Sequence, residues 1–329
     1  MFKRRTCMST RTELLKLLDE NFGSFVSGEK IGRELGISRA AINKAATSLR
    51  KTGYRILSRP SQGYRLMEKA DLLTEESIGS HVKFPCRFKI FDTIDSTNSY
   101  AKTIDVDDEP IAIIANAQTA GRGRLGRKFA SPAGTGVYIS VAFRPRFELD
   151  KSAFITMATA IAVCHAIDEV CGVNPKIKWV NDIFYKGLKV CGILTEAQTN
   201  LETGRIDSLI TGIGINCFPG SFPPELDGIA GSISTDADSF SRSALAGTVI
   251  NNVLKMLSLF PDTSFLKEYR RRCFIIGKNV TVNPISGGRS VSARVLGVED
   301  NGGLVVEYME GIRMREIDTL TTGEVSIKE

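Results

Sequence analysis

A short segment rich in glycine and arginine has the residue types of an anion-binding loop. Gly121 to Lys128 places three glycines and four cations in eight residues, directly after the apolar run Ile111 to Ala117. Glycine lets the backbone approach a ligand closely, successive N–H groups surround an anion, and arginine donates a fork of hydrogen bonds to carboxylate or phosphate. A solvated turn or an RNA-binding patch has a similar composition, so the neighbouring motifs must decide between these interpretations.

Three further clusters accompany this loop. Asp95-Ser96-Thr97-Asn98 follows a predicted strand and is also typical of a helix cap. Lys178-Trp179-Val180-Asn181-Asp182 ends a short strand with a carboxylate, and Lys186 and Lys189 precede an apolar strand. Gly212-Ile213-Gly214-Ile215-Asn216 lets a backbone pass close to a ligand, although a bulge has the same sequence pattern.

Other kinds of site are disfavoured. The chain has no Walker A sequence and no Gly-x-Gly-x-x-Gly that opens a helix, which argues against a P-loop or Rossmann site. The seven cysteines form no Cys-x-x-Cys pair and lie mostly among apolar neighbours, so core thiols are expected rather than metal ligands. His81 lies in a polar connector and His165 within an apolar helix pattern, and neither indicates a zinc site or histidine catalysis.

Length and composition indicate a multidomain globular protein. At 329 residues the chain is long enough for two or three domains, and 42% of its residues are hydrophobic. The apolar stretch Ala153 to Val170 is interrupted by Thr, His and Asp, and the basic start lacks the apolar region of a signal peptide. We therefore expect a cytoplasmic protein with no membrane partner.

Positive charge is concentrated in the first part of the chain. Residues 1–66 hold 14 Lys/Arg and five Asp/Glu, a net charge of +9, while the whole chain carries +6, so residues 67–329 carry −3. A basic module of this kind is expected to bind a polyanion.

The basic module has the helix pattern of a helix-turn-helix. Thr10-Arg11-Thr12-Glu13 predicts a capping box, and the turn Leu35-Gly36-Ile37-Ser38 separates the second and third helices. The expected bounds are Thr10 to Glu20, Ser27 to Gly36, and Ser38 to a stop at Gly53. The third helix has an apolar stripe of Ile42, Ala45, Ala46 and Leu49.

The outward face of the third helix offers residues that reach phosphates and base edges in a major groove. These candidates are Arg39, Asn43, Lys44, Thr47 and Arg50. Residues 54–57 and 63–66 alternate like strands and predict a β-wing with Arg59 at its tip. An interaction module with a solvated face is the alternative, but the charge surplus and the wing favour DNA.

The middle of the chain predicts a mixed α+β sheet rather than a strictly parallel one. The predicted strands are Phe88 to Phe91, Ile111 to Ala117, Val137 to Phe143, one near Ile177, Val190 to Glu196, and Leu209 to Ile215, with a helix from Ser152 to Val170. Four short strands are predicted in the tail, at Asn279 to Asn283, Val291 to Leu296, Leu304 to Tyr308 and Ile312 to Ile317.

Taken together, the motifs resemble those of the bifunctional biotin protein ligase and biotin operon repressor family. The resemblance rests on the ordered motifs at 38–44, 118–127, 178–182, 189–194 and 212–216, and it extends over essentially the whole chain. It implies an α+β multidomain fold with a winged helix-turn-helix at 1–68, a ligase domain related to class II synthetases at 69–276, and an SH3-like β-barrel at 277–329. For the barrel we expect a structural role.

The implied reaction joins biotin to ATP and then transfers biotin from biotinyl-5′-AMP to a lysine of a biotin carboxyl carrier protein. Because the first step brings two anions together, the site needs positive charge, which Arg122, Arg124 and Lys189 would supply. Asp182 would bind Mg²⁺, which is coordinated by carboxylate and phosphate oxygens.

The resemblance also implies ligand-binding residues. For biotin they are Ser96, Thr97, Gln118, Gly121, Arg122, Arg124, Lys189, Gly192 and Gly212. For ATP and the adenylate they are Arg122, Gly123, Arg124, Arg127, Phe129, Asn181, Lys189 and Asn216. Some relatives cover adenine with a tryptophan in the loop that follows, but Phe218 to Thr235 contains none.

Operator DNA and a homodimer formed when the adenylate is bound are the remaining implied partners. Three alternatives stay open on sequence alone. One is a ligase with a vestigial DNA-binding domain, another is a lipoate-type ligase, and the third is a biotin-sensing repressor without catalysis. Retention of Arg124, Asp182 and Lys189 disfavours the third.

Overall fold

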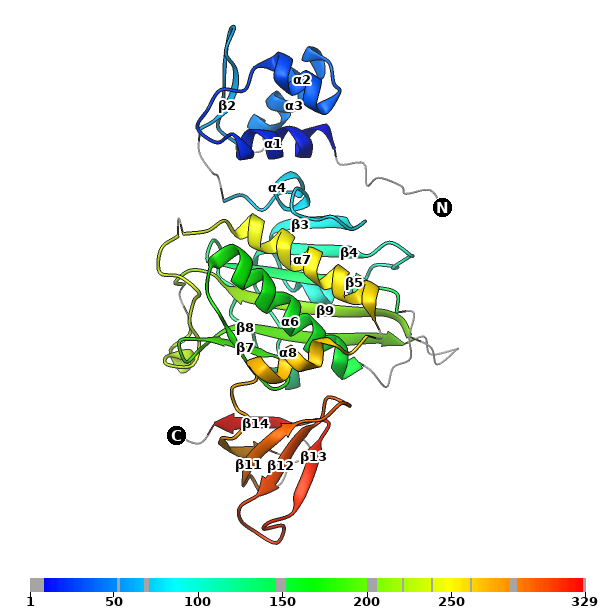
Figure 1. Ribbon diagram of the computed structural model, residues 1–329, viewed down its shortest axis with the longest axis vertical. Helices are drawn as coiled ribbons and strands as arrows, with labels where there is room; N and C mark the ends of the chain where they lie inside the picture. Colours follow the sequence, from blue (N-terminus) through cyan, green and yellow to red (C-terminus); the bar gives the residue numbers. More distant parts are fainter. Residues whose placement is uncertain are drawn as a thin grey trace.

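The protein, a computed structural model, consists of three parts stacked along its longest axis (Figure 1). Helices α1 to α3 lie at one end, a large sheet covered by helices lies in the middle, and a small sheet lies at the other end. The structure describes residues 9–51, 54–67, 71–145, 152–199, 206–220, 222–237, 239–260, 262–283 and 289–327. The predicted domain boundary at 68/69 and the predicted helix stop at Gly53 lie outside these residues.

The first part has a hydrophobic core of its own, to which all three helices contribute. The helices are α1 (Thr10–Glu20), α2 (Gly28–Leu35) and α3 (Arg39–Lys51). Ser27 caps α2 and Gly36 ends it with φ 68°, as the sequence predicts. The predicted stripe of α3 is buried. The cap of α1 is Ser9, whose side chain accepts from the Thr12 backbone N–H, so the predicted capping box at Thr10 lies one residue too late.

The wing is a two-stranded hairpin of β1 (Ile56–Arg59) and β2 (Gly63–Leu66). The first strand begins two residues later than predicted because Tyr54 is buried in the helical core instead. Val26 forms a backbone bridge to Tyr64, which attaches the hairpin to the α1–α2 connection.

Polar contacts join this part to the rest of the chain. Arg11 of α1 pairs with the buried Glu76 of α4 (Glu75–Gly79). Arg242 is only 7% exposed and binds both the side chain and the backbone of Asp71 in the connecting segment. The helix-turn-helix is therefore attached to the central part by charged groups as well as by the chain.

The central sheet has seven strands, and its only parallel pair among the described strands is β3–β4. In spatial order the strands are β3 (Arg87–Ile94), β4 (Ile111–Gln118), β5 (Gly136–Phe143), β9 (Ile206–Asn216), β8 (Leu188–Thr199), β7 (Asp182–Tyr185) and β6 (Lys176–Lys178). The predicted mixed sheet is confirmed, and β7 is a strand that the sequence analysis did not identify.

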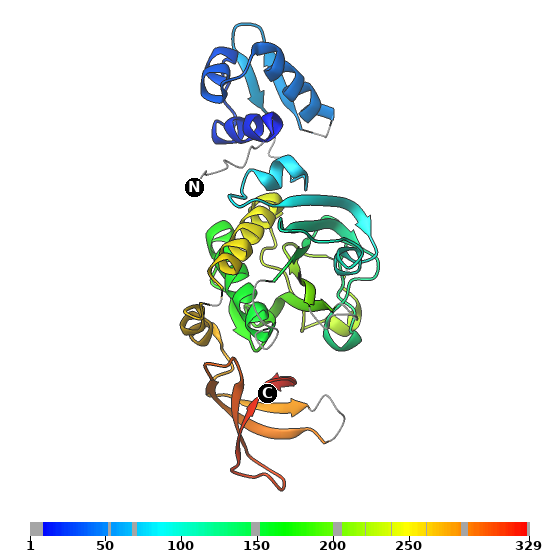
Figure 2. The same cartoon turned by 90° about the vertical axis from the view of Figure 1, so that its right-hand side faces the viewer.

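Long helices cover one face of this sheet, and the other face carries the short helix α5 (Thr97–Ala101) (Figure 2). The covering helices are α6 (Ser152–Cys171), α7 (Arg242–Leu259) and α8 (Phe265–Arg272). Within the described residues, α6 is the one helix long and apolar enough to cross a membrane, over Phe154–Cys171, and 72% of that stretch is buried. Its composition is that of a helix in the core of the protein.

The third part is an open five-stranded antiparallel sheet, so the predicted SH3-like barrel is not confirmed. The strand order is β13 (Ile317–Leu320), β12 (Leu304–Tyr308), β11 (Val291–Val298), β10 (Asn279–Asn283) and β14 (Glu324–Ile327). Among the described strands, β13 and β14 stay at opposite edges and do not pair. The predicted strand at Ile312 is wrong, because Ile312 is fully exposed in a turn between Gly311 and Arg315, which both have positive φ.

Candidate active site

Three glycines form the floor of a cavity on the face of the central sheet that carries α5. Gly192 of β8 pairs with Gly214 of β9, and Gly212 lies two residues along the same strand. A Cβ atom at Gly214 would lie 2.6 Å from Cζ of Phe129, and one at Gly212 would lie 2.8 Å from Cγ of Asn98. The side chains of Phe129 and Asn98 therefore require glycine at positions 214 and 212. Because these glycines have no side chains, the cavity lies directly on the backbone of the strands.

The cavity has a volume of about 230 Å³ and gathers residues from motifs far apart in the sequence. The predicted residues that line it are Ser96, Thr97, Gln118, Arg122, Gly123, Arg124, Arg127, Phe129, Asn181, Asp182, Lys189, Gly192, Gly212 and Asn216. Gly121 is the one predicted ligand-binding residue outside this lining. It packs against Gln118, Ser131 and the Phe129 carbonyl, so a side chain at this position would disturb the loop rather than reach the ligand.

Neutral hydrogen-bonding groups form one end of the cavity, near β4 and α5. The Thr97 backbone N–H donates to Gln118 Oε1 at 2.9 Å, and Gln118 Nε2 donates to Ser131 Oγ at 2.9 Å. Ser140, which is fully buried, lies 2.7 Å from the Thr97 hydroxyl. Ser96 is the N-cap of α5. These contacts fix the orientation of neutral donors and acceptors beside an apolar floor.

The glycine-arginine segment folds into a compact loop over the cavity. The Gly123 N–H donates to the Arg127 carbonyl at 2.7 Å, and the Arg127 N–H donates to the Arg124 carbonyl at 3.1 Å. Leu125 and Gly126 between them have φ 54° and 74°. Left-handed backbone is costly for leucine, so this turn is held by the bonds around it.

Arg122 pairs with a carboxylate that sequence reasoning did not identify. Its Nη2 lies 3.0 Å from Glu196 Oε1, and Lys102 Nζ lies 2.8 Å from the same oxygen. Burial alone would raise the pKa of Glu196, but hydrogen bonds from Lys102 and Asn98 and the charges of Lys102 and Arg122 lower it below its usual value. Glu196 therefore remains an anion that holds Arg122 in place.

The other two arginines of the loop contact different partners. Arg124 donates to Asn181 Oδ1 at 3.0 Å and to the Gly323 carbonyl at 3.4 Å. Arg127 makes two hydrogen bonds of 2.7 Å to the carboxylate of Glu324. Each predicted arginine thus has a protein partner.

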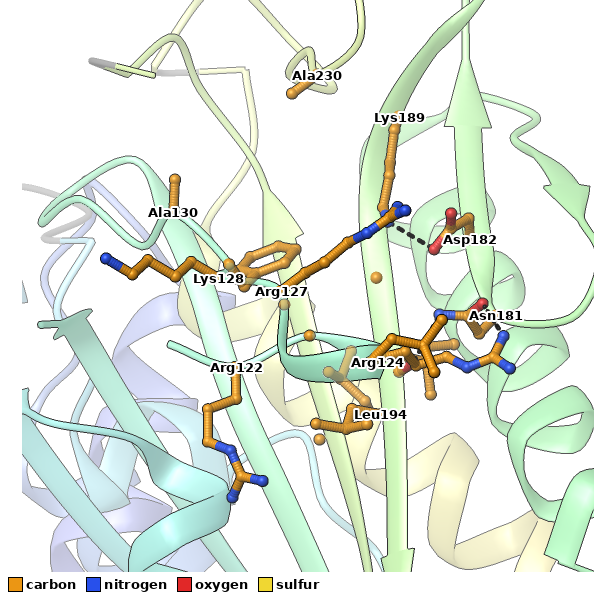
Figure 3. Close-up of a pocket in the computed structure, with 18 of the residues that line it drawn as sticks. Arg122, Arg124, Arg127, Lys128, Ala130, Asn181, Asp182, Lys189, Leu194 and Ala230 are labelled. Carbon is orange, nitrogen blue, oxygen red and sulfur yellow. Dashed lines mark hydrogen bonds and ion pairs between the residues drawn. The ribbon is translucent and has the colours of Figure 1, made fainter. Parts of the chain in front are cut away.

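Lys189 and Asp182 form an ion pair at the charged end of the cavity (Figure 3). Lys189 Nζ lies 2.6 Å from Asp182 Oδ1, and the two residues come from neighbouring strands, β8 and β7. In Figure 3 Arg127 extends toward this pair, whereas Arg122 points away from it, toward the side where Glu196 lies.

One buried oxygen in this pair fits a magnesium ligand. Asp182 Oδ1 is buried and makes no hydrogen bond, because its contact with Lys189 is an ion pair outside hydrogen-bond geometry. Among the described residues, no group of three or more His, Cys, Asp or Glu could hold a metal. Mg²⁺ in nucleotide sites commonly takes only one or two carboxylates together with phosphate oxygens and water, so a single carboxylate suits it.

A segment after β9 covers the cavity. Phe222, Leu226, Ile229 and Ala230 line it from above. The Lys189 N–H donates to the Ile229 carbonyl at 2.9 Å, which attaches this segment to β8. The loop from Phe218 to Thr235 has no tryptophan, but it places these apolar side chains over the cavity instead.

The C-terminal sheet, for which a structural role was expected, also contributes residues to the cavity lining. Gly323, Glu324 and Val325 line the cavity at the start of β14. Trp179, also in the lining, donates from Nε1 to the Gly302 carbonyl at 3.0 Å and joins the two sheets. Glu324 lies 197 positions from Arg127 in the sequence, and no local pattern identifies such a contact.

Lys178 is another lining residue outside the predicted set. It is half-buried and lies opposite Asp182 in the β6–β7 register. Burial lowers the pKa of the Lys178 ammonium below its usual value, although the charges of Asp182 and Glu324 oppose the shift. Its position at the start of the Lys-Trp-Val-Asn-Asp motif was the available signal.

The predicted DNA-binding residues form a separate site at the far end of the molecule (Figure 1). Arg39, Asn43, Lys44 and Thr47 are all exposed on α3. Arg50 is half-buried, and its Nε donates to the Ile56 carbonyl at 2.7 Å, so it also supports the wing. The Arg59 guanidinium lies over the ring of Phe25, 5.4 Å from its centre.

Three family models match the chain in the order of its three parts. The HTH domain matches residues 10–65, the biotin/lipoate A/B protein ligase family matches residues 90–216, and the biotin protein ligase C terminal domain matches residues 275–328.

Similar proteins agree with these matches. The bifunctional ligase/repressor BirA of Bacillus subtilis is 34% identical over 320 residues, which cover 92% of this chain and 95% of that protein. BirA of Escherichia coli is 29% identical over 317 residues, covering 93% and 94%. The solved structure of the Aquifex aeolicus biotin protein ligase in complex with biotin and ATP has a TM-score of 0.62 and 26% identity, and the match covers 74% of this chain and 98% of that one. The chain belongs to the family of bifunctional biotin protein ligases and repressors.

Proposed function

We propose that this chain activates biotin with ATP to form biotinyl-5′-AMP and pyrophosphate, transfers biotin to a lysine of a biotin carrier protein, and represses biotin genes. The observation that carries the ligase proposal is the polarity of the cavity. Its neutral end suits the uncharged ureido ring of biotin, and its cationic end suits a carboxylate and a triphosphate.

In the first step a biotin carboxylate oxygen attacks the α-phosphorus of ATP, and the bond from that phosphorus to the bridging oxygen breaks. The two reactants repel each other, so the site must hold both anions close together. Lys189 would lie between them once its 2.6 Å pair with Asp182 opens. Arg124 is held beside this pair by Asn181, within reach of the same charges.

Arg122 has a different starting position, because Glu196 holds it at 3.0 Å. We propose that the biotin carboxylate competes with Glu196 for this guanidinium, so that the loop closes as biotin enters. Gly123 and Gly126 in the loop leave the backbone free to approach the ligand.

Asp182 would hold Mg²⁺ through its buried Oδ1, and the ion, when bound, supplies positive charge to the phosphate oxygens. The release of Asp182 toward an ion also frees Lys189 to meet the reacting anions. When Asp182 exchanges Lys189 for the ion, the ammonium of Lys189 and the ion would both be placed next to the reacting anions.

The adenine ring would be covered by the apolar side chains of Phe222, Leu226 and Ile229 rather than by a tryptophan. An aromatic ring and two aliphatic side chains supply the contact area that a planar base needs. Ile229 is 54% exposed, so the base would bury it.

Repression would use the exposed cations of α3 on operator DNA. One helix-turn-helix covers a half-site, so we propose that the adenylate-bound protein forms a homodimer that covers two. The protein would act in the cytoplasm, where ATP, carrier and operator are all available. Footprinting on a biotin-gene promoter with and without biotin plus ATP tests this part. Affinity that ignores both ligands would contradict control by the adenylate, and absence of a footprint under either condition would leave a ligase with a vestigial DNA-binding domain.

The ligase proposal is tested by exchange of labelled pyrophosphate into ATP. We expect exchange only when biotin is present. Exchange that responds to lipoate and not to biotin would favour a lipoate-type ligase, and absence of exchange with either would leave a sensor without catalysis.

A further inference from the structure

One half-buried cation in the lining of the cavity has no hydrogen-bond or ion-pair partner among the described residues. Six cations line the cavity, and four of them, Arg122, Arg124, Arg127 and Lys189, contact a protein oxygen. Lys128 has no side-chain partner among the described residues, but it is exposed and water can solvate it. Lys178, the other cation without such a partner, is a half-buried residue, and its ammonium forms no hydrogen bond or ion pair within the described part of the chain.

The acids near Lys178 are already engaged. Asp182 pairs with Lys189, and Glu324 makes two hydrogen bonds to Arg127. These four charges cancel. Arg124 contacts only neutral oxygens, those of Asn181 and Gly323, so Arg124 and Lys178 both leave uncompensated positive charge at this end of the cavity, and of the two Lys178 has no hydrogen bond either. A half-buried cation without a counter-charge is unfavourable in the free protein, and an anionic ligand would remove that penalty.

The order of the strands indicates which anion this is. Thr97 and Gln118, at the neutral end, are associated with β3 and β4, while Lys189, Asp182 and Lys178 lie on β8, β7 and β6 at the other side of the sheet. In phosphoryl and nucleotidyl transfer the attacking and leaving oxygens lie roughly in line across the phosphorus. If biotin attacks from the neutral end, the leaving pyrophosphate points toward β6.

We propose that Lys178 binds the β- and γ-phosphates of ATP and stabilises the pyrophosphate as it leaves. The reaction balances within the proposed function on which this inference rests. The carboxylate oxygen forms a bond to the α-phosphorus, the bond from that phosphorus to the bridging oxygen breaks, and pyrophosphate keeps the electron pair next to the Lys178 ammonium. Lys178 has no contact with the biotin end, and biotinyl-5′-AMP lacks the two phosphates it binds.

This assignment predicts a split between the two half-reactions. Loss of a charge-assisted hydrogen bond should raise the KM for ATP and for pyrophosphate in Lys178→Met by about 10- to 100-fold. Transfer of biotin from supplied biotinyl-5′-AMP to a carrier domain should stay within about twofold of the unmodified protein. Lys178→Arg keeps the charge and should recover most of the affinity for pyrophosphate.

The matched control is Lys176→Met on the same strand, because Lys176 is exposed, lies outside the cavity and, among the described residues, makes its side-chain hydrogen bond to Asn174. Thermal unfolding of every variant checks that each is folded, and Lys178→Gln serves if the methionine variant is not. Unchanged KM values for ATP and pyrophosphate would overturn the assignment. So would an equal loss in both half-reactions, which indicates a structural role, or a loss confined to carrier transfer, which indicates recognition of the carrier. Absence of biotin-dependent exchange in the unmodified protein would reject the proposed function itself.

Discussion

A single added methyl group at Gly212 should damage both the stability of the central sheet and its affinity for biotin. In Gly212→Ala the new Cβ would lie 2.8 Å from Cγ and 2.9 Å from Nδ2 of Asn98, and closer still to Oδ1. The backbone of Gly212 is not in the left-handed region, so the effect comes from this contact alone. The side chain of Asn98 must move for alanine to fit.

The hydrogen bonds that hold Asn98 set the size of the effect. This residue is 4% exposed, Ser140 Oγ lies 2.6 Å from its Oδ1, and its Nδ2 donates to Glu196 Oε2 at 2.9 Å. Its Nδ2 also donates to the Leu194 carbonyl at 3.3 Å. A bond to a neutral group is worth about 1 kcal/mol and one to a charged group about 1.5–3 kcal/mol, so losing the bonds to Ser140 and Glu196 alone costs about 3 kcal/mol. Because Ser140 also contacts Thr97, we expect biotin affinity to fall about tenfold or more.

Two measurements check this prediction. Urea unfolding followed by the fluorescence of Trp179, the single tryptophan, reports the stability of the central part, and calorimetry reports biotin binding. Gly297→Ala is the control, because no described residue other than its chain neighbours has an atom within 4 Å of the added Cβ and its φ is not positive, so it should change stability by less than about 0.5 kcal/mol. Equal behaviour of the two variants would refute the packing argument. Adding Asn98→Ala to Gly212→Ala should relieve the clash without restoring biotin affinity.

Three more predictions follow from the charged residues. Lys189→Ala should slow adenylate formation by about 10²- to 10³-fold in single-turnover experiments, and a rate within about threefold of the unmodified protein would contradict its role. Arg39→Ala and Lys44→Ala should each weaken operator binding in footprinting titrations and reduce the salt slope by about one for each phosphate that the variant no longer neutralises; an unchanged slope would argue against DNA binding by these side chains. Burial would raise the pKa of Glu268, but hydrogen bonds, first from Arg272, lower it to about 2. Since the pKa is lowered, this stabilisation is complete above the unfolded value of about 4.3 and disappears as the pH falls toward 2, so Glu268→Gln should show less destabilisation than the unmodified protein in an acid titration by circular dichroism.

Local signals predicted most of the fold. Ser27 and Gly36 give α2 its bounds because capping depends on adjacent residues. The wing strand was placed two residues early because Tyr54 fits a strand pattern, while packing against the helices buries it instead. The predicted barrel was not confirmed for a similar reason, since pairing between the edge strands β13 and β14 depends on the arrangement of the whole sheet.

Some residues of the active site were predicted from local sequence, and others depend on contacts that form only in the folded protein. Its motif residues line one cavity because strand ends carry them to one face. Glu196, which holds Arg122, lay within a predicted strand but in no motif. Glu324 was out of reach of sequence reasoning, because its contact with Arg127 exists only once the third part has folded against the second.

The contact between Arg127 and Glu324 has a consequence for the synthesis of the protein on the ribosome. Chains emerge N-terminus first, and early domains fold while later ones are still being made. The helix-turn-helix has its own hydrophobic core, so it can fold when only the first part has left the ribosome. The lining contributed by Gly323, Glu324 and Val325 arrives after every other strand described, so a partly made chain contains a DNA-binding surface but no complete cavity. The lining of the cavity is therefore complete only after β14 has left the ribosome.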